Sequence, residues 1–189
     1  MCGGKIIMLL IPTIIKEIET VLSQIEENQL QNIAVQLQNA KRIFVIGEGR
    51  SGLMAKSFAM RLMHLGATVY VVGETITPSI EEGDLLVAIS GSGTTKNVAW
   101  TAEKTNSLGC SVVGITTNPE SPLASAATTI LHVPAATKYR RENELKTIQP
   151  LGSLFDQCAH IVFDTLCLQY SALTQVDHNA AFGRHSNLE

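Results

Sequence analysis

Long runs of basic residues are missing from this 189-residue chain. Its longest clusters of positive charge are Lys41-Arg42 and Arg140-Arg141, and 14 Lys and Arg against 17 Asp and Glu give a formal net charge of -3 at pH 7. Nucleic acids and anionic membrane surfaces attract proteins that carry concentrated basic patches. We therefore expect neither nucleic acid nor membrane among the partners of this protein.

Cysteine is also scarce. The four cysteines stand at positions 2, 110, 158 and 167, a spacing that contains no C-x-x-C pair. This pattern indicates neither a zinc site nor a disulfide framework, and it suits a reducing compartment. The sequence predicts a cytoplasmic protein with no metal site.

A long hydrophobic run is absent too. The apolar start, Met1 to Ile11, contains Lys5, is followed by Glu17 and precedes no small-residue cleavage site. Such a run is too short to span a membrane and does not have the form of a secretion signal. Met8 is an alternative start, with Met1 to Ile7 as an extension, and the sequence leaves both open.

The apolar content is high for the amount of charge. Hydrophobic residues make up 45% of the chain and charged residues 16%. A chain of this length fits one domain, 1-189, and the surplus of apolar surface predicts an oligomer in which subunit contacts cover it. Within that domain we expect N-terminal helix at 11-39, a core at 41-173 and a polar tail at 174-189.

Helix and strand signals alternate through the core. Apolar residues from Ile14 to Leu37 recur at helical spacing, as one long helix or two joined near Glu27-Asn28. Five short apolar runs then predict strands at Arg42 to Ile46, Thr68 to Val72, Leu85 to Ser90, Ser111 to Thr116 and Thr129 to Val133. Helices are expected at Gly52 to Leu65, Thr95 to Leu108, Leu123 to Ala127 and Leu151 to Leu173.

This alternation predicts an α/β fold. Continuous apolar strands are typical of a parallel sheet covered by helices on both faces. We expect a three-layer αβα sandwich with the flavodoxin-like strand order 2-1-3-4-5. In that order the loops after the first and third strands converge, and a ligand binds where they meet.

The loop after the third strand combines hydroxyl groups with glycines. Ser90-Gly91-Ser92-Gly93-Thr94-Thr95 leads directly into a helix, whose free N–H groups and dipole favour an anion. A hydroxyl residue here can also be an ordinary helix cap. Because the loop carries more hydroxyls than a cap needs, we interpret it as a phosphate-binding loop.

The loop after the first strand is Gly47-Glu48-Gly49-Arg50-Ser51-Gly52. It satisfies G-x-G-x-x-G, with Glu74 at a distance suited to a ribose, and alone it would indicate a dinucleotide. A second, hydroxyl-rich anion loop counts against that interpretation. The lysine of a P-loop is absent too, because Leu53 stands in its place.

Taken together, the two loops resemble those of the SIS (sugar isomerase) domain family. Other segments resemble the 6-phospho-3-hexuloisomerases within it: 61-66, 73-78, 148-155 and 183-189, so that the resemblance covers Ile11 to Glu189. It implies a phosphosugar substrate, interconversion of D-arabino-hex-3-ulose 6-phosphate and D-fructose 6-phosphate in the ribulose monophosphate pathway, and a homotetramer. It also implies functional coupling to hexulose-6-phosphate synthase and no metal or nucleotide cofactor.

The resemblance also implies site residues. Asp156 stands where the family has its catalytic carboxylate, usually Glu, and would move the proton between C3 and C2 through an enediolate. His185 in the tail would assist from a neighbouring subunit. The phosphosugar would be held by Gly49, Arg50, Ser51, Ser90, Gly91, Ser92, Gly93, Thr94 and Thr95.

Plainer interpretations of these residues stay open. Asp156 can simply complement a helix dipole, and His185 can be a solvated tail residue. Two other functions also stay open: a non-catalytic sugar-phosphate sensor, and an isomerase for another phosphosugar, because a phosphate loop recognises only one end of its substrate.

Overall fold

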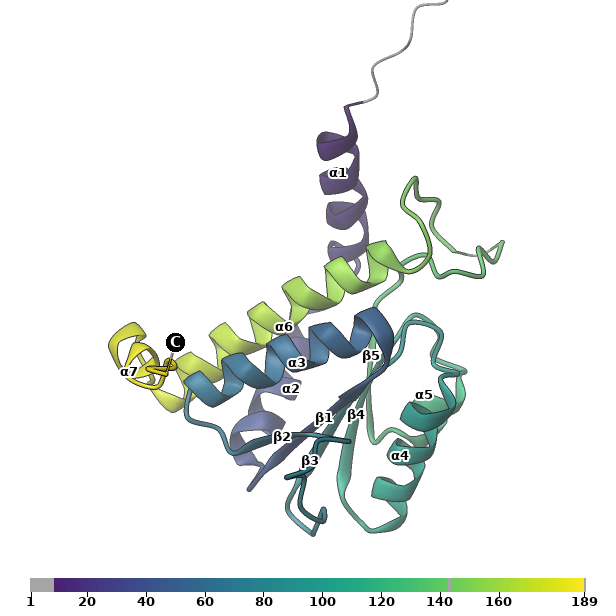
Figure 1. The fold of residues 1–189 in the computed structure, drawn as a ribbon. Coiled ribbons are helices and arrows are strands. Elements are labelled where there is room, and N and C mark those ends of the chain that lie inside the picture. The colour runs from purple at the N-terminus through teal and green to yellow at the C-terminus, as the bar shows by residue number, and fades with distance from the viewer. Residues whose placement is uncertain (1–8, 143, 189) are drawn as a thin grey trace, which may run out of the picture.

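The computed structural model describes residues 9–142 and 144–188. Its centre is a five-stranded parallel sheet in the order β2-β1-β3-β4-β5. The strands are β1 (Ile43–Gly47), β2 (Val69–Val71), β3 (Leu85–Ile89), β4 (Ser111–Thr116) and β5 (Thr129–His132). The predicted strand order and fold class are confirmed, and Figure 1 shows the sheet between its helices.

The central strands are apolar because both faces of the sheet are covered. In β1, Ile43 and Val45 join the core cluster on one face, whereas Phe44 and Ile46 join the cluster on the other. Residues along a strand alternate between faces, so a strand buried on both sides must be apolar at every position. The continuous runs in the sequence reflect this burial.

Helices form the two outer layers. One face carries α2 (Glu27–Asn39), α3 (Gly49–His64) and α6 (Ser153–Thr174), and the other carries α4 (Lys96–Ser107) and α5 (Pro122–Ala126). The three-layer arrangement is visible in Figure 1. Helix α3 begins three residues earlier than predicted, which places Arg50 and Ser51 in its first turn.

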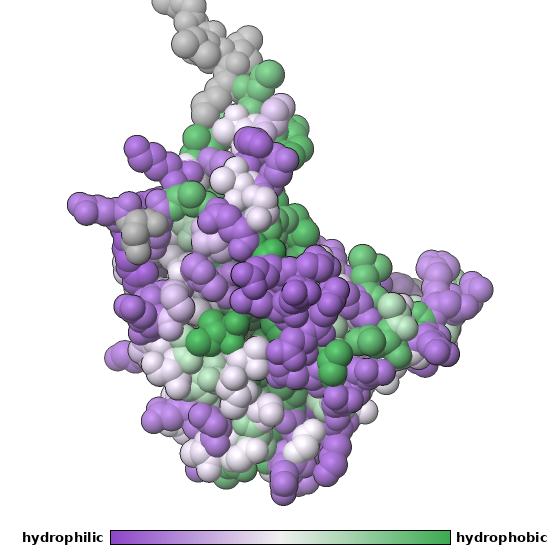
Figure 2. Space-filling view, turned by 180° about the vertical axis from the view of Figure 1, so that it is seen from behind, coloured by the Kyte–Doolittle hydropathy of each residue, from purple (hydrophilic) through white to green (hydrophobic). Residues whose placement is uncertain are grey.

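The N-terminal helical segment consists of two helices, one of the two predicted alternatives. Helix α1 (Leu10–Leu22) ends before Glu26, and α2 starts at Glu27. The outer end of α1 projects beyond the sheet layers in Figure 1. Apolar residues lie along this projecting part in Figure 2, and Leu10, Ile11 and Ile15 are exposed. The question of Met1 or Met8 as the start lies outside the described residues, as do Cys2 and Glu189.

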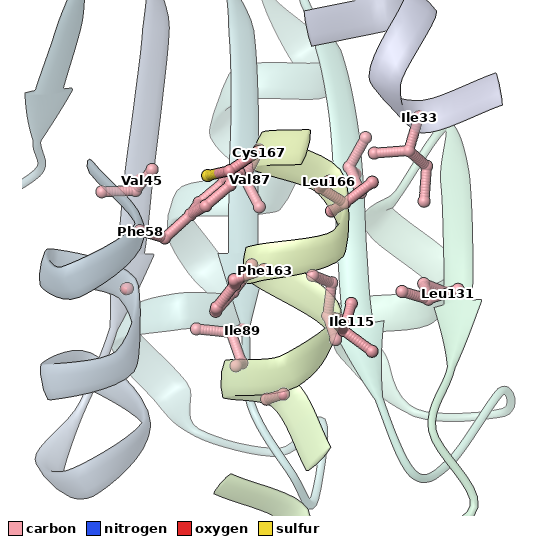
Figure 3. Packing of buried hydrophobic residues seen from close by; sticks show 14 of the residues in the cluster. Ile33, Val45, Phe58, Val87, Ile89, Ile115, Leu131, Phe163, Leu166 and Cys167 are labelled. Carbon is pink, nitrogen blue, oxygen red and sulfur yellow. The ribbon is translucent and has the colours of Figure 1, made fainter. Parts of the chain in front are cut away.

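Helix α6 holds much of the core. Figure 3 shows Phe163 and Leu166 of α6 pointing toward the sheet, with Phe58 of α3 beside them. The rings of Phe58 and Phe163 stack with centroids 4.3 Å apart. Beyond α6 the predicted polar tail contains a short helix, α7 (His178–Phe182), started by the Asp177 side chain, which accepts a hydrogen bond from the Ala180 amide at 2.8 Å.

We predict that Phe163→Ala lowers the free energy of unfolding by about 3–5 kcal/mol, because it empties a buried aromatic site in the main core. Trp100→Ala is the control, since Trp100 is 63% exposed on α4, and it should change that free energy by less than about 1 kcal/mol. Urea denaturation followed by circular dichroism measures both. Equal losses in the two variants would contradict this account of the core.

Candidate functional site

A cavity of about 570 Å³ opens at the carboxyl ends of β1 and β3. The first turns of α3 and α6 and the segment before α6 complete its walls. Ligands of open α/β sheets bind at such a switch point between strands. Its lining residues are Glu48, Gly49, Arg50, Ser51, Ile89, Ser90, Gly91, Ser92, Thr95, Thr137, Lys138, Pro150, Leu151, Gly152, Ser153, Phe155 and Asp156.

The start of α3 meets the start of α6 across this cavity. The Ser51 hydroxyl donates a hydrogen bond to Oδ1 of Asp156 at 2.7 Å, and Arg50 Nε lies 3.5 Å from Oδ2. Arg50 also donates to the Ser153 hydroxyl at 3.1 Å. Two residues of the glycine-rich loop therefore hold the carboxylate that the resemblance singled out.

Glycines bring this loop close to the sheet. A Cβ atom on Gly52 would lie 2.6 Å from the Gly47 carbonyl oxygen, so the first turn of α3 packs directly on the end of β1. Helix–strand packing thus accounts for the spacing of these two glycines. The G-x-G-x-x-G pattern needs no dinucleotide to explain it.

Asp156 is a buried carboxyl group at the wall of this cavity. Only 5% of the residue is exposed. Burial raises its pKa above the usual value, while the Ser51 hydroxyl and the Arg50 guanidinium act in the lowering direction; the net effect is a raised pKa. A carboxylate of raised pKa is a stronger base, as proton abstraction beside a carbonyl requires.

The hydroxyl-rich loop forms the opposite wall. Ser90 and Thr95 hydroxyls lie 2.8 Å apart, and the Gly93 amide donates to the Ser90 hydroxyl at 3.2 Å. Helix α4 starts at Lys96, immediately after this loop. Ser90, Gly91, Ser92 and Thr95 line the cavity, so small donors face it at a helix N-terminus.

Gly93 and Thr94 are placed differently from the rest of the loop. Gly93 has a φ of +67° and is packed against Ser121, where a side chain would collide. Thr94 is exposed, and its hydroxyl lies 2.9 Å from that of Ser92. Neither residue lines the cavity; Gly93 shapes the loop, and Thr94 lines a separate groove beside α4.

Sequence reasoning missed part of the lining. Ser153 binds Arg50, and Thr137 and Lys138 reach the cavity from the connection after β5. That connection stood out only as a long polar segment, a kind of loop that often carries function. No local motif distinguishes Thr137 or Lys138 within it.

His185 lies far from Asp156 of the same chain. Its ring stacks on that of His64 at the C-terminal end of α3, with centroids 5.3 Å apart. Arg184 beside it donates to the His64 carbonyl oxygen at 3.2 Å. Helix α6 has 22 residues and a length of about 33 Å, and it separates the two regions. The structure does not bring this pair of predicted catalytic residues together within one chain.

Two further features concern metals and membranes. Among the residues that the structure describes, no three His, Cys, Asp or Glu side chains are grouped to hold a metal ion. None of the helices formed by residues 9–142 and 144–188 has both the length and the hydrophobicity of a membrane span.

Comparison with known proteins points to one family. The SIS domain model matches residues 36–161. A Bacillus subtilis (strain 168) protein named 3-hexulose-6-phosphate isomerase is 41% identical over 176 residues, which are 93% of this chain and 95% of that protein. A Mycobacterium gastri protein of the same name is 40% identical over 173 residues, covering 92% and 86%.

A solved structure gives the same picture. The crystal structure of a Methanococcus jannaschii protein, for which a molecular function of 3-hexulose-6-phosphate isomerase was inferred, matches with a TM-score of 0.83 at 31% identity. The match covers 95% of this chain and 99% of that one. The likeness therefore extends over nearly the whole chain.

We predict that Asp156→Asn raises the free energy of unfolding at pH 7. The folded-state pKa of Asp156 is raised above 3.8, so the folded protein binds this proton more tightly than the unfolded chain. Ionisation therefore opposes folding as the pH rises, and the variant removes that penalty. The gain should disappear below the unfolded-state pKa, where the wild-type carboxyl is neutral.

Urea titrations at pH 7 and pH 3 measure this difference. Asp164→Asn on the same helix is the matched control, because the Asp164 side chain is 60% exposed and its replacement should change stability little at either pH. A loss of stability in Asp156→Asn at pH 7 would show that the Arg50 and Ser51 contacts outweigh burial.

Proposed function

The chain belongs to the SIS domain family, and from this premise we propose that it is an isomerase that interconverts D-arabino-hex-3-ulose 6-phosphate and D-fructose 6-phosphate. The Bacillus subtilis and Mycobacterium gastri relatives are named 3-hexulose-6-phosphate isomerase. The observation that carries the proposal is the position of Asp156, a buried carboxyl of raised pKa at one wall of a cavity whose other wall is the hydroxyl loop.

The two walls suit the two ends of a phosphosugar. Ser90, Ser92 and Thr95 with the N-terminus of α4 offer donors to the phosphate. The carbonyl and hydroxyl carbons then extend toward α3 and α6. Arg50, which carries a positive charge 3.5 Å from Asp156, would stabilise the negative oxygen of an enediolate.

The reaction needs one base that acts twice. Asp156 would take the proton from C2 of the 3-ulose, and the electrons of that bond would form the enediolate between C2 and C3. Loss of the O2 proton gives the C2 carbonyl, O3 is protonated, and Asp156 returns its proton to C3. No redox partner is required, because hydrogen only moves between neighbouring atoms.

Asp156 is shorter than the Glu that the family usually has at this position. In this chain the carboxylate is held at 2.7 Å by the Ser51 hydroxyl. Misplacing a catalytic group by about 1 Å can reduce a rate on the order of a hundredfold. The Ser51 and Arg50 contacts are therefore what would fix the shorter side chain in a productive position.

An oligomer fits the same proposal. The exposed apolar residues of the projecting α1 are suited to burial against another subunit. His185, which packs on His64 at the far end of α6, would then serve the cavity of a neighbour rather than its own. We propose a homotetramer of this kind, located in the cytoplasm, whose substrate is supplied by hexulose-6-phosphate synthase.

We predict that Asp156→Asn abolishes turnover of hex-3-ulose 6-phosphate while the phosphosugar still binds. The variant removes the base but leaves the hydroxyl loop intact. A coupled assay for fructose 6-phosphate measures turnover, and calorimetry with fructose 6-phosphate measures binding. Asp164→Asn is the matched control and should keep full activity. Unchanged turnover in Asp156→Asn would remove Asp156 from the mechanism.

Subunit sharing of the site makes a separate prediction. Asp156→Asn and His185→Ala should each be poorly active alone. In oligomers re-formed from a 1:1 mixture, about one site in four combines an intact Asp156 of one subunit with an intact His185 of its neighbour, so the mixture should regain about a quarter of wild-type activity. Dissociation, mixing and assay test this. Full activity of His185→Ala alone would remove His185 from the mechanism, and a mixture without recovery would place both residues in one chain.

A further inference from the structure

A polar network ties helix α1 to the segment that leads into the cavity. The Glu17 carboxylate on α1 accepts hydrogen bonds from the Thr147 hydroxyl at 2.6 Å, the Ile148 amide at 2.8 Å and the Gln149 side-chain amide at 3.0 Å. Such a set satisfies both oxygens of one carboxylate. Residues 130 or more positions apart in the sequence are thus joined at a single side chain.

The network is partly shielded and charged. Gln149 is 6% exposed, and Glu17 is half-buried. Burial acts to raise the Glu17 pKa, but the bonds from Thr147, Ile148 and Gln149 and the charge of Arg140 act against it, and the pKa is lowered overall. Hydrogen bonds to a charged group are stronger than those between neutral groups. The anion at position 17 is therefore the form that holds the segment.

The same segment is held from its other side. Arg140 donates a hydrogen bond to the backbone carbonyl oxygen of Gln149, and the backbone amide of Gln149 donates to the Thr147 hydroxyl at 3.0 Å. Gln149 is thus fixed through its side chain, its backbone carbonyl and its backbone amide. The next residues, Pro150 to Ser153, line the cavity and start α6.

Backbone geometry shows why this segment needs support. Leu151 has a φ of +52°, in the left-handed region that side chains other than glycine rarely adopt. Such a conformation persists only where the surroundings impose it. Leu151 lies two residues after Gln149 and two before Ser153, so the strain sits between the Glu17 network and the helix that carries Asp156.

We propose that Glu17 is a positioning residue for the isomerase site: its carboxylate anchors residues 147–149 and so fixes the cavity wall and the first turn of α6. The inference rests on the proposed function for its kinetic test alone. Glu17 does not line the cavity that holds Asp156, so it acts through Gln149 and the residues that follow. In this way a residue of α1 influences the geometry of the cavity.

Glu17→Gln tests the proposal. The new amide group would face the donors of Thr147 and Gln149, so the anchor is lost with little change in size. We expect kcat to fall roughly tenfold to a hundredfold, as for a misplaced catalytic group, and KM to change less than about threefold because the hydroxyl loop is untouched. Glu19→Gln on the same helix is the matched control, since Glu19 is 66% exposed, and should keep wild-type kinetics.

A swapped pair distinguishes positioning from general damage. In Glu17→Gln with Gln149→Glu, an amide at position 17 can donate to a carboxylate at position 149, so the contact is restored with its polarity reversed. We expect kcat to recover at least partly relative to either single variant. Kinetics of Glu17→Gln equal to those of Glu19→Gln, or a double variant that shows only the summed losses, would overturn the proposal.

Hydrogen exchange provides a measurement that does not depend on activity. Amide exchange in residues 147–156 should accelerate in Glu17→Gln and not in Glu19→Gln. Unchanged exchange in Glu17→Gln would overturn the role of Glu17, whatever the turnover of the wild-type protein. A wild-type protein that shows no turnover would reject the proposed function, but the exchange measurement would still test the role of Glu17. If Glu17→Gln does not fold, Thr147→Val, which removes only one of the bonds, is measured in the same way.

Discussion

The pairing of β1 with β3 is the constraint on which the rest of this structure depends. Register pairs Ile43 with Leu85 and Gly47 with Ile89, so the two strands end side by side. Because the strands are parallel, the glycine-rich loop after β1 and the hydroxyl loop after β3 leave the same edge of the sheet. The hydroxyl-rich wall and the wall that holds the Asp156 carboxylate therefore face each other without any long excursion of the chain.

Helix α6 adds the Asp156 carboxyl group to this edge. Its apolar face is buried against α2, α3 and the sheet, which fixes its rotation and its height above β3. That packing delivers Asp156 to the Ser51 hydroxyl at 2.7 Å. The core thus has a direct chemical consequence, since the same burial that stabilises the helix also raises the pKa of the carboxyl group at its start. The stability of the helix and the raised pKa of Asp156 depend on one packing arrangement.

The fold and the two loops at the strand ends follow from local sequence signals, whereas the rest of the cavity lining does not. Strands buried on both faces are continuously apolar, so the parallel sheet was predictable, and right-handed crossovers favour the order 2-1-3-4-5. Arg50, Ser51 and Ser90 were found because glycines and hydroxyls cluster next to strand ends. Gly93 and Thr94 belong to the same cluster, but the positive φ of Gly93 directs them away from the cavity.

Long-range contacts account for most of what sequence reasoning missed. Glu17 meets Thr147 across 130 positions, and no periodicity or motif signals such a meeting. The short α7 lies in a polar tail without an apolar repeat, and its placement against the end of α3 depends on Arg184 and His64. The role of Asp156 as a carboxylate of the site came from family resemblance, since an acidic residue in the first turn of a helix is common for electrostatic reasons alone.

The most direct test of the central claim is to incubate the purified protein with enzymatically generated hex-3-ulose 6-phosphate, in the presence of EDTA, and to measure the fructose 6-phosphate formed. Steady turnover without added metal is the predicted result, because in the proposed mechanism Asp156, Arg50 and the hydroxyl loop supply the base, the charge and the phosphate site. Binding of the phosphosugar with no product formed would contradict the account and identify the cavity as that of a sugar-phosphate sensor.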